Sequence, residues 1–300
     1  MILVVGSTGL VGNEICTQLA EQKLPFRALV RKDSATEKVN HLKSLGAEIV
    51  VGNLKEPVSL AAACVGINKI ISTVSCTFTM REGDSIETVD RQGQLNLVEA
   101  AKNAHVKRFV FISFGNNPEN AFPLSEAKRA VEHALAESGM NWSSLQASYF
   151  MEVWLSPALG FNYPQSQARI YGDGDNKVSW ISYKDVARLA VAALDNNYAE
   201  NRTLAIGGPE PLSPKQVVNI FEKTFGTTFT LEHLPKEALL QQKKAATNPL
   251  EESFASLMIQ YADGDNMDMS GIMEQVGVNL TSVESYAQAV KAMADNMQRV

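Results

Sequence analysis

Short apolar runs alternate with segments of helical periodicity through the first two thirds of the chain. Residues 1–5 form an apolar run, and residues 13–20 then carry apolar side chains at helical spacing. Further apolar runs that predict strands occupy residues 26–30, 47–51, 69–74, 108–113, 142–147 and 203–208, and helical patterns occupy residues 57–63, 84–104, 125–138 and 183–194. Strands that alternate with helices build a parallel sheet covered on both faces. The pattern therefore predicts an α/β fold with a doubly wound parallel sheet.

A glycine-rich turn joins the first predicted strand to the first predicted helix. Its sequence is Gly6-Ser7-Thr8-Gly9-Leu10-Val11-Gly12. The first glycine permits a tight turn, the second lets the backbone approach a pyrophosphate, and the third lets the helix pack closely on the strand. The free N–H groups at the start of the helix would then face the phosphates. This context predicts a dinucleotide site, and the alternative is a purely structural turn.

Two cations follow the second strand. Arg31 and Lys32 stand where an NAD-specific fold usually carries an acid that binds the ribose 2′-hydroxyl. A guanidinium and an ammonium favour the 2′-phosphate of NADP instead, because both donate charge-assisted hydrogen bonds to phosphate. We therefore expect NADP(H) as the cofactor, and the alternative is a solvated basic loop.

The regular alternation of strand and helix patterns changes after residue 150. From Pro209 onward the chain is rich in helical patterns, and Ser213-Pro214 is a typical helix start. We expect residues 1–150 and 179–208 to form a Rossmann domain that binds NADP. Residues 151–178 and 209–300 are expected to form a smaller, mostly helical C-terminal lobe that covers the substrate and the cofactor.

Composition narrows the class of protein. The chain has 300 residues, 45% of them hydrophobic, and a net charge of −6, which argues against nucleic acid as a partner. No apolar stretch approaches the roughly 20 residues that span a bilayer, and the start does not resemble a signal peptide, so we expect a cytoplasmic protein without a membrane partner. Its three cysteines and four histidines show no metal-ligand spacing, so no metal is expected. A monomer and a homodimer both remain open.

Together these motifs resemble those of atypical short-chain dehydrogenases/reductases of the NmrA-like group, and of the isoflavone reductases and quinone oxidoreductases related to it. The resemblance rests on the glycine turn and on Leu29-Val30-Arg31, Gly52-Asn53-Leu54, Phe111-Ile112-Ser113-Phe114, Lys128, Ser148-Tyr149-Phe150-Met151 and residues 172–187. It implies NADP in an extended pose, with adenine near Asn53 and nicotinamide near Lys128. We expect cofactor contacts from Gly6, Ser7, Thr8, Gly9, Leu10, Val11, Gly12, Arg31, Lys32, Asn53, Leu54, Thr73, Val74, Ser75, Ser113, Phe114, Lys128, Tyr149, Phe150 and Met151.

One position departs from the wider superfamily. Short-chain dehydrogenases usually have a tyrosine four residues before the lysine, where the ammonium lowers the pKa of the phenol. Here that residue is Leu124, so the pair cannot perform tyrosine acid/base chemistry. The resemblance to isoflavone reductases assigns the catalytic role to Lys128, which could instead only bind the nicotinamide ribose. Ser113 could orient the substrate or cofactor, or be a satisfied turn hydroxyl.

Two functions follow from these residues. The first is an NADPH-dependent oxidoreductase that reduces a small carbonyl, quinone or conjugated aromatic substrate, with Trp154 and Trp180 beside the acceptor. The second is a non-catalytic redox sensor or assembly protein that binds NADP without turnover. The missing tyrosine favours the second function, whereas the intact glycine turn, Lys128 and the aromatic residues favour the first.

Overall fold

The computed structural model describes residues 1–77, 80–115 and 120–297. The chain divides into two compact units. Unit 1 comprises Met1–Asn116, Ala121–Gln146 and Val186–Leu204, and unit 2 comprises Asn117–Asn120, Ala147–Asp185 and Ala205–Val300. The division into a cofactor domain and a substrate lobe stays a prediction, because compactness alone does not assign a binding role.

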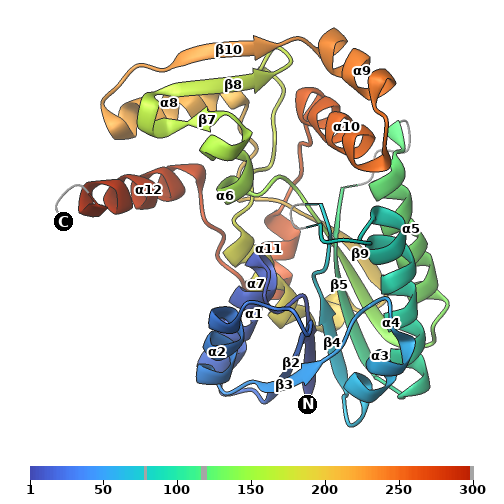
Figure 1. Ribbon diagram of the computed structural model, residues 1–300. Helices are drawn as coiled ribbons and strands as arrows, with labels where there is room; N and C mark the ends of the chain where they lie inside the picture. Colours follow the sequence, from blue (N-terminus) through green and yellow to red (C-terminus); the bar gives the residue numbers. More distant parts are fainter. Residues whose placement is uncertain (78–79, 116–119, 298–300) are drawn as a thin grey trace. The chain divides into compact units, whose positions relative to one another are not determined.

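Unit 1 is built on a seven-stranded sheet with the order β3-β2-β1-β4-β5-β6-β9 (Figure 1). The strands are β1 (Ile2–Val5), β2 (Phe26–Val30), β3 (Glu48–Val51), β4 (Lys69–Ser72), β5 (Arg108–Phe114), β6 (Asn141–Ala147) and β9 (Arg202–Ile206). The pairs from β3 through β5 are parallel. The strand order reverses between β1 and β4, which is where such sheets open a crevice for ligands. The predicted doubly wound α/β fold is confirmed.

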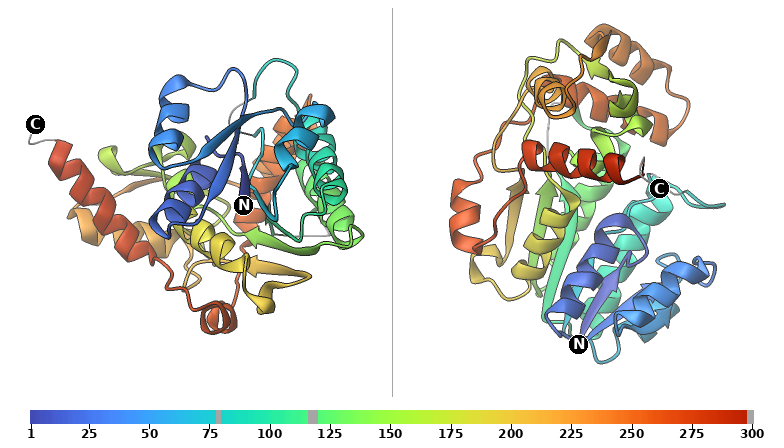
Figure 2. Two further views of the ribbon diagram at one scale, coloured as in Figure 1. Left: turned by 90° about the horizontal axis from the view of Figure 1, so that it is seen from below. Right: turned by 90° about the vertical axis from the view of Figure 1, so that its left-hand side faces the viewer.

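Helices cover both faces of this sheet, which is why β1 and most of β5 are apolar and buried. Helices α1 and α2 lie on one face, and α3, α4 and α5 lie on the other (Figure 1 and Figure 2). The bounds are α1 (Leu10–Glu21), α2 (Thr36–Ser44), α3 (Pro57–Cys64), α4 (Gln92–Asn103), α5 (Pro123–Ala136) and α7 (Tyr183–Ala193), with a 3-10 turn η5 (Asn197–Ala199) before β9.

The helix expected over residues 84–104 is divided in two. Its first part is a π-helical turn, η1 (Ile86–Arg91), and α4 follows it directly. Ser85 and Thr88 form a capping box that fixes the start of the turn. A π-helical turn changes which side chains face the sheet, and such turns are frequent at functional sites.

Unit 2 combines helices with a three-stranded sheet of order β10-β8-β7. Its strands are β7 (Phe161–Asn162), β8 (Gln167–Tyr171) and β10 (Thr230–Leu234), and its short 3-10 turns are η3 (Pro157–Leu159) and η4 (Tyr163–Gln165). Its helices are α6 (Met151–Trp154), α8 (Pro214–Phe225), α9 (Lys236–Ala245), α10 (Pro249–Asp263), α11 (Ser270–Val276) and α12 (Val283–Met297). Helices α8 and α12 pack on each other, as do α9 and α10. A core rich in aromatic side chains joins these elements.

In the part of the chain that the structure describes, no helix is both long and apolar enough to cross a bilayer. The cytoplasmic location, the lack of nucleic-acid binding and the monomeric or dimeric state stay predictions.

The glycine turn generates a test of the fold. A Cβ atom at Gly12 would lie 2.1 Å from the carbonyl oxygen of Gly6, which is backbone and cannot rotate away. We expect Gly12→Ala to lower the free energy of unfolding by about 3 kcal/mol or to prevent folding. Urea unfolding measures this effect.

Gly271 provides the matched control, because it also lies in the first turn of a helix but has nothing within 4 Å of an added Cβ. Gly271→Ala should leave stability unchanged or raise it by up to about 1 kcal/mol. Equal losses at both positions would show that Gly12 makes no special close approach.

Candidate functional site

The turn from Gly6 to Gly12 leaves bare backbone at the start of α1. The Gly9 N–H donates to the Gly6 carbonyl at 2.9 Å, and Gly6 has a φ of +89°, which favours glycine. Gly9 is the N-cap residue of α1. Because it has no side chain, no side-chain hydrogen bond satisfies the first N–H groups of the helix. The Ser7 hydroxyl is buried and donates to the Leu29 carbonyl at 2.7 Å, so Ser7 fastens the turn to β2. The first N–H groups of α1 can therefore bind an anionic group.

Arg31 at the end of β2 is part of an ion cluster. Its guanidinium donates to a carboxylate oxygen of Asp84 at 2.7 Å, and the Lys55 ammonium donates to the other oxygen at 2.7 Å. The Arg81 backbone N–H reaches the same carboxylate at 3.3 Å. The Arg31 guanidinium is about a third exposed and has further N–H groups, so it can bind a phosphate while it holds Asp84.

The cations also control the charge of Asp84, whose side chain is only 2% exposed. Burial by itself would raise the pKa of this carboxyl, but the hydrogen bonds and charges of Lys55 and Arg31 outweigh burial and hold the pKa below its usual value. Arg81 forms a second ion pair with Asp33. Lys32 is exposed and Thr8 is half-buried. The cluster of Arg31, Lys55, Arg81, Asp33 and Asp84 therefore carries a net positive charge beside β2.

Asn53 and Leu54 shape the loop after β3. The Asn53 side chain accepts the Lys55 backbone N–H at 3.1 Å, so it stabilises its own turn. Leu54 is buried and lies against Gly93 of α4, where an added Cβ would come within 2.8 Å of the Leu54 side chain. This loop therefore exposes part of the Asn53 amide, whereas the Leu54 side chain packs inward, and the contacts of both residues with adenine stay predictions.

The segment after β4 closes on the glycine turn. Thr73 donates its N–H to the Val5 carbonyl at 3.0 Å, and its hydroxyl oxygen would lie only 2.5 Å from a Cβ at Gly6. The Val74 carbonyl accepts hydrogen bonds from Gln94 at 3.2 Å and from Lys128 at 3.3 Å. The Ser75 hydroxyl pairs with that of Thr77 at 3.2 Å. The end of β4 therefore connects the turn to Lys128.

Ser113 and Phe114 end strand β5 beside α5. The Arg129 guanidinium donates to the Ser113 hydroxyl at 2.8 Å and to the Phe114 carbonyl at 2.9 Å. The Ser113 oxygen is thus already an acceptor in a partly buried pair, as the turn-hydroxyl alternative requires. Its part in orienting a substrate or cofactor stays a prediction.

Lys128 is held in a buried position on α5, and Leu124 lies buried one turn before it. The Lys128 ammonium lies 3.6 Å from a carboxylate oxygen of Asp90 and 4.9 Å from the centre of the Phe111 ring. Burial lowers the pKa of Lys128, and the charge of Asp90 opposes that effect. Within unit 1, the structure brings Lys128 together with Val74.

The predicted aromatic residues of unit 2 pack on one another. Tyr149 meets Trp154 edge to face at a centroid distance of 4.8 Å, and Trp154 stacks on Tyr261 at 5.6 Å. The Tyr149 hydroxyl donates to the Leu257 carbonyl at 3.0 Å, and burial raises its pKa. Phe150 and Trp154 are half-buried, and they are therefore the better candidates for contact with an acceptor.

Trp180 is completely buried in this cluster. Its indole N–H donates to the Leu212 carbonyl at 2.9 Å, and its ring lies 6.4 Å from Tyr149. Met151 is also fully buried. Trp180 and Met151 can influence a ligand through the side chains that they support, and their direct contacts with a ligand stay predictions.

Sequence reasoning missed Lys55, Asp84 and Asp90, and only Asp90 left a usable signal. Asp90 lies four residues before Gln94 within an apolar helical pattern, which places both polar residues on one helix face. Asp84 and Lys55 stand in loops, where charged residues are ordinary. Their pairing with Arg31 depends on the folded sheet.

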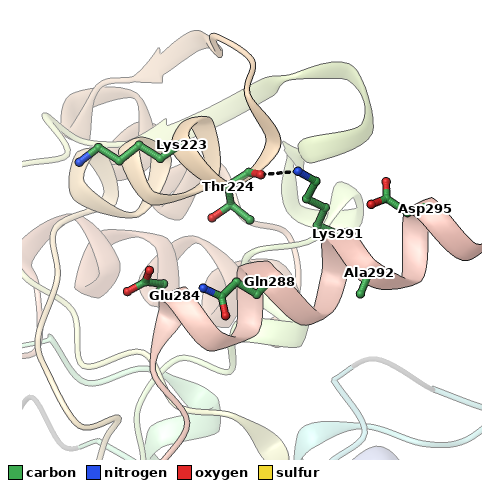
Figure 3. A pocket seen from close by; sticks show the side chains of 7 residues that line it. All are labelled: Lys223, Thr224, Glu284, Gln288, Lys291, Ala292 and Asp295. Atoms are coloured by element: carbon green, nitrogen blue, oxygen red, sulfur yellow. Dashed lines mark hydrogen bonds between the residues drawn. The ribbon is translucent and has the colours of Figure 1, made fainter.

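No group of three or more side chains suited to a metal ion occurs among residues 1–77, 80–115 and 120–297. A pocket on unit 2 lies between α8 and α12, and Figure 3 shows its charged lining. It is lined by Lys223, Thr224, Glu284, Gln288, Lys291, Ala292 and Asp295, and Lys291 donates to the Thr224 carbonyl at 2.8 Å. None of the predicted site residues lines this pocket.

Comparison with known proteins gives matches over nearly the whole chain. The model of the NmrA-like family matches residues 1–287. The chain is 32% identical over 299 residues to the NAD(P)H azoreductase of Xenophilus azovorans, and the match covers 98% of each protein. It is 28% identical over 300 residues to the photosystem II assembly factor Ycf39 of Synechocystis sp. (strain ATCC 27184 / PCC 6803 / Kazusa), covering 96% of this chain and 89% of that protein.

A solved structure shows the same fold. The NADPH-dependent quinone oxidoreductase QOR2 from Escherichia coli, complexed with NADPH, superposes with a TM-score of 0.78. The match covers 97% of this chain and 99% of that one at 19% sequence identity. At this identity the likeness shows the fold.

The ion cluster generates a test by double-mutant cycle at pH 7. We expect Arg31→Ala and Asp84→Asn to be coupled by about 1 kcal/mol in the free energy of unfolding, because each single change removes a partner from a partly buried pair. Chemical unfolding of the four proteins gives this coupling energy.

The exposed pair of Lys215 and Asp175, at 2.9 Å, serves as the control cycle. Its coupling should stay below about 0.5 kcal/mol because water screens it. The interpretation of Asp84 as a buried centre of the cluster would be wrong if both cycles gave the same small coupling.

Proposed function

The chain belongs to the NmrA-like family, and we propose that it is an NADPH-dependent oxidoreductase of the atypical short-chain dehydrogenase/reductase type. The acceptor would be a small carbonyl, quinone or conjugated aromatic compound. One observation carries the proposal. In unit 1 the buried ammonium of Lys128 lies beside Val74, in the segment after β4 that packs against the glycine turn. The NAD(P)H azoreductase similar to the whole chain supports the same reaction class.

The residues of unit 1 fit NADP(H). A Cβ at Gly9 or Gly12 would approach the Gly6 carbonyl to 3.3 or 2.1 Å, so the backbone at these two positions stays bare. That backbone and the start of α1 would hold the pyrophosphate. Arg31, with Lys32 and Lys55 nearby, would bind the 2′-phosphate. In this proposal residues 1–150 and 179–208 bind the cofactor, and residues 151–178 and 209–300 cover the acceptor.

When bound, NADPH would supply the hydride. The chain's own part is to position the acceptor and deliver a proton. Leu124 has no proton to give, so the Lys128 ammonium is the proposed proton donor. Trp154 and Phe150 would wall the acceptor, and Trp180 would support Tyr149 behind them.

A second function has its own support. Leu124 is buried and apolar where an acid/base tyrosine would stand, and a relative that spans most of the chain is named an assembly factor. A non-catalytic NADP-binding sensor or assembly protein would need the glycine turn and Arg31, but would not need a proton donor at Lys128. Turnover therefore decides between the two functions.

The first test is NADPH oxidation with a panel of quinones, aldehydes, enones and azo compounds. At saturating NADPH, Lys128→Met should slow hydride transfer in stopped flow by about 10²-fold, because the ammonium is lost while the apolar stem remains. Lys69→Met is the control. Lys69 is the first residue of β4 and pairs with Asp195, so this pair lies at the opposite end of the strand from Val74 and Lys128. It should leave the rate unchanged.

An unchanged rate in Lys128→Met would reduce Lys128 to a ribose ligand. If no acceptor in the panel were reduced while NADPH still bound, the sensor or assembly function would replace the reductase.

The second test concerns the choice of cofactor. Arg31→Ala should weaken NADPH binding at least tenfold and leave NADH binding almost unchanged, since a charge-assisted phosphate contact contributes about 1.5 to 3 kcal/mol. Titration calorimetry measures both affinities. Arg202→Ala removes an arginine that stacks on Tyr198 and should change neither affinity. Equal losses for NADPH and NADH in Arg31→Ala would contradict the assignment of the 2′-phosphate to Arg31.

A further inference from the structure

The surroundings of Lys128 contain one acid that the proposed reaction does not yet use. The Lys128 side chain is 5% exposed and that of Asp90 is fully buried, with 3.6 Å between nitrogen and oxygen. The other neighbours of the ammonium are the Val74 carbonyl and the Phe111 ring. Neither of these carries a negative charge, so Asp90 supplies the counter-charge at contact distance.

The π-helical turn places Asp90 at this point. One carboxylate oxygen, Oδ2, accepts the Cys76 backbone N–H at 3.1 Å, which anchors the acid to the segment after β4. Gln94, four residues later, donates to the Val74 carbonyl and so holds the same segment. Two side chains from one helix face therefore fix both the backbone acceptor and the charged partner of Lys128.

The second carboxylate oxygen of Asp90, Oδ1, faces Lys128. Oδ1 is buried and has no hydrogen-bond partner in the described part of the chain, and the Lys128 ammonium is the cation that it faces. A buried carboxylate oxygen without a hydrogen bond is costly, so such groups need a specific reason to persist. The distance of 3.6 Å between the Lys128 nitrogen and Oδ1 is longer than the about 2.7 to 2.9 Å of a charge-assisted hydrogen bond.

We propose that Asp90 is the positioning residue of Lys128, and that its carboxylate keeps the ammonium charged and holds it near the end of β4. This inference rests on the proposed function, in which Lys128 delivers the proton. The gap at Oδ1 leaves the ammonium free to turn toward a substrate without leaving its counter-charge.

The direction of the pH effect follows from the neighbours. Burial lowers the pKa of Lys128, whereas the negative charge of Asp90 raises it again. Burial raises the pKa of the Cys76 thiol, so Cys76 stays neutral near pH 7. Glu132, one turn along α5, already pairs with Arg129 and accepts from Ser144. Removing the charge of Asp90 should therefore lower the pKa of Lys128 further.

The test is an NMR titration of protein labelled with 13C at the lysine ε-carbon, with the Lys128 signal assigned by its loss in Lys128→Met. In Asp90→Asn the Lys128 midpoint should fall by at least about one pH unit relative to the unsubstituted protein. Asp90→Glu, which keeps the charge, should restore most of the shift. An unchanged midpoint in Asp90→Asn would overturn the proposal.

Asp185→Asn is the matched control. Asp185 is fully buried and accepts hydrogen bonds from the Thr281 N–H and hydroxyl, so its loss removes a buried carboxylate of unit 2. This variant should lose stability and leave the Lys128 midpoint unchanged. If it moved the midpoint as much as Asp90→Asn does, the shift would report general loosening and contradict a specific role of Asp90.

Kinetics provide the functional measurement. The alkaline limb of kcat against pH should move to lower pH in Asp90→Asn by the same amount as the Lys128 midpoint, with little change in the KM for NADPH. A midpoint that shifts while the limb does not would leave Asp90 without a role in proton delivery and overturn that part of the proposal. If no acceptor is turned over, the proposed function fails, whereas the titration still decides whether Asp90 controls Lys128.

Failure of Asp90→Asn to fold would not close the question. In the unsubstituted protein the 13Cγ signal of Asp90 should move at the pH where Lys128 loses its proton, and this movement should vanish in Lys128→Met. An Asp90 signal that does not respond to Lys128 would overturn the proposal without the Asn variant.

Discussion

The close approach of the Gly12 backbone to the Gly6 carbonyl is the constraint on which the rest of unit 1 depends. Because a Cβ at position 12 would lie 2.1 Å from that carbonyl oxygen, only glycine lets α1 start directly beside β1. This approach gives α1 its short connection and leaves its first N–H groups bare. Thr73 then fits against Gly6, which brings the end of β4 to the same place. A larger side chain at position 12 would displace both the helix and the neighbouring strand end.

Buried carboxylates organise the cations around this turn. Asp84 and Asp90 both come from the segment between β4 and α4, and each is almost completely buried. Asp84 holds Arg31 and Lys55 near the end of β2, whereas Asp90 faces Lys128. A buried ion pair gains little net stability because desolvation offsets the attraction between the charges. Orientation of the cations is the better explanation for keeping such costly groups in place.

The apolar strands, the glycine turn and the change of pattern after residue 150 were readable in the sequence, because each depends on neighbouring residues. Helix α2 was missed because only Leu42 of its residues is buried, so it shows little apolar periodicity. Strand β10 was missed for the same reason, since four of its five residues are exposed. The partners of Arg31 and Lys128 lie 53 and 38 positions away in the chain, and only the folded sheet brings them together. Leu124 was the clearest chemical signal, because the resemblance to short-chain dehydrogenases predicts a tyrosine proton donor at that position.

The central claim is that this chain transfers hydride from NADPH to an acceptor, and isotope transfer tests that claim most directly. The protein is incubated with NADPH that carries deuterium at the 4R or the 4S position of nicotinamide, together with an acceptor of the carbonyl or conjugated enone class. Mass spectrometry of the reduced acceptor, at a hydride-receiving carbon that does not exchange with water, should show one deuterium from one of the two labelled forms. A reduced product without deuterium from either form, or no product while NADPH remains bound, would contradict the account.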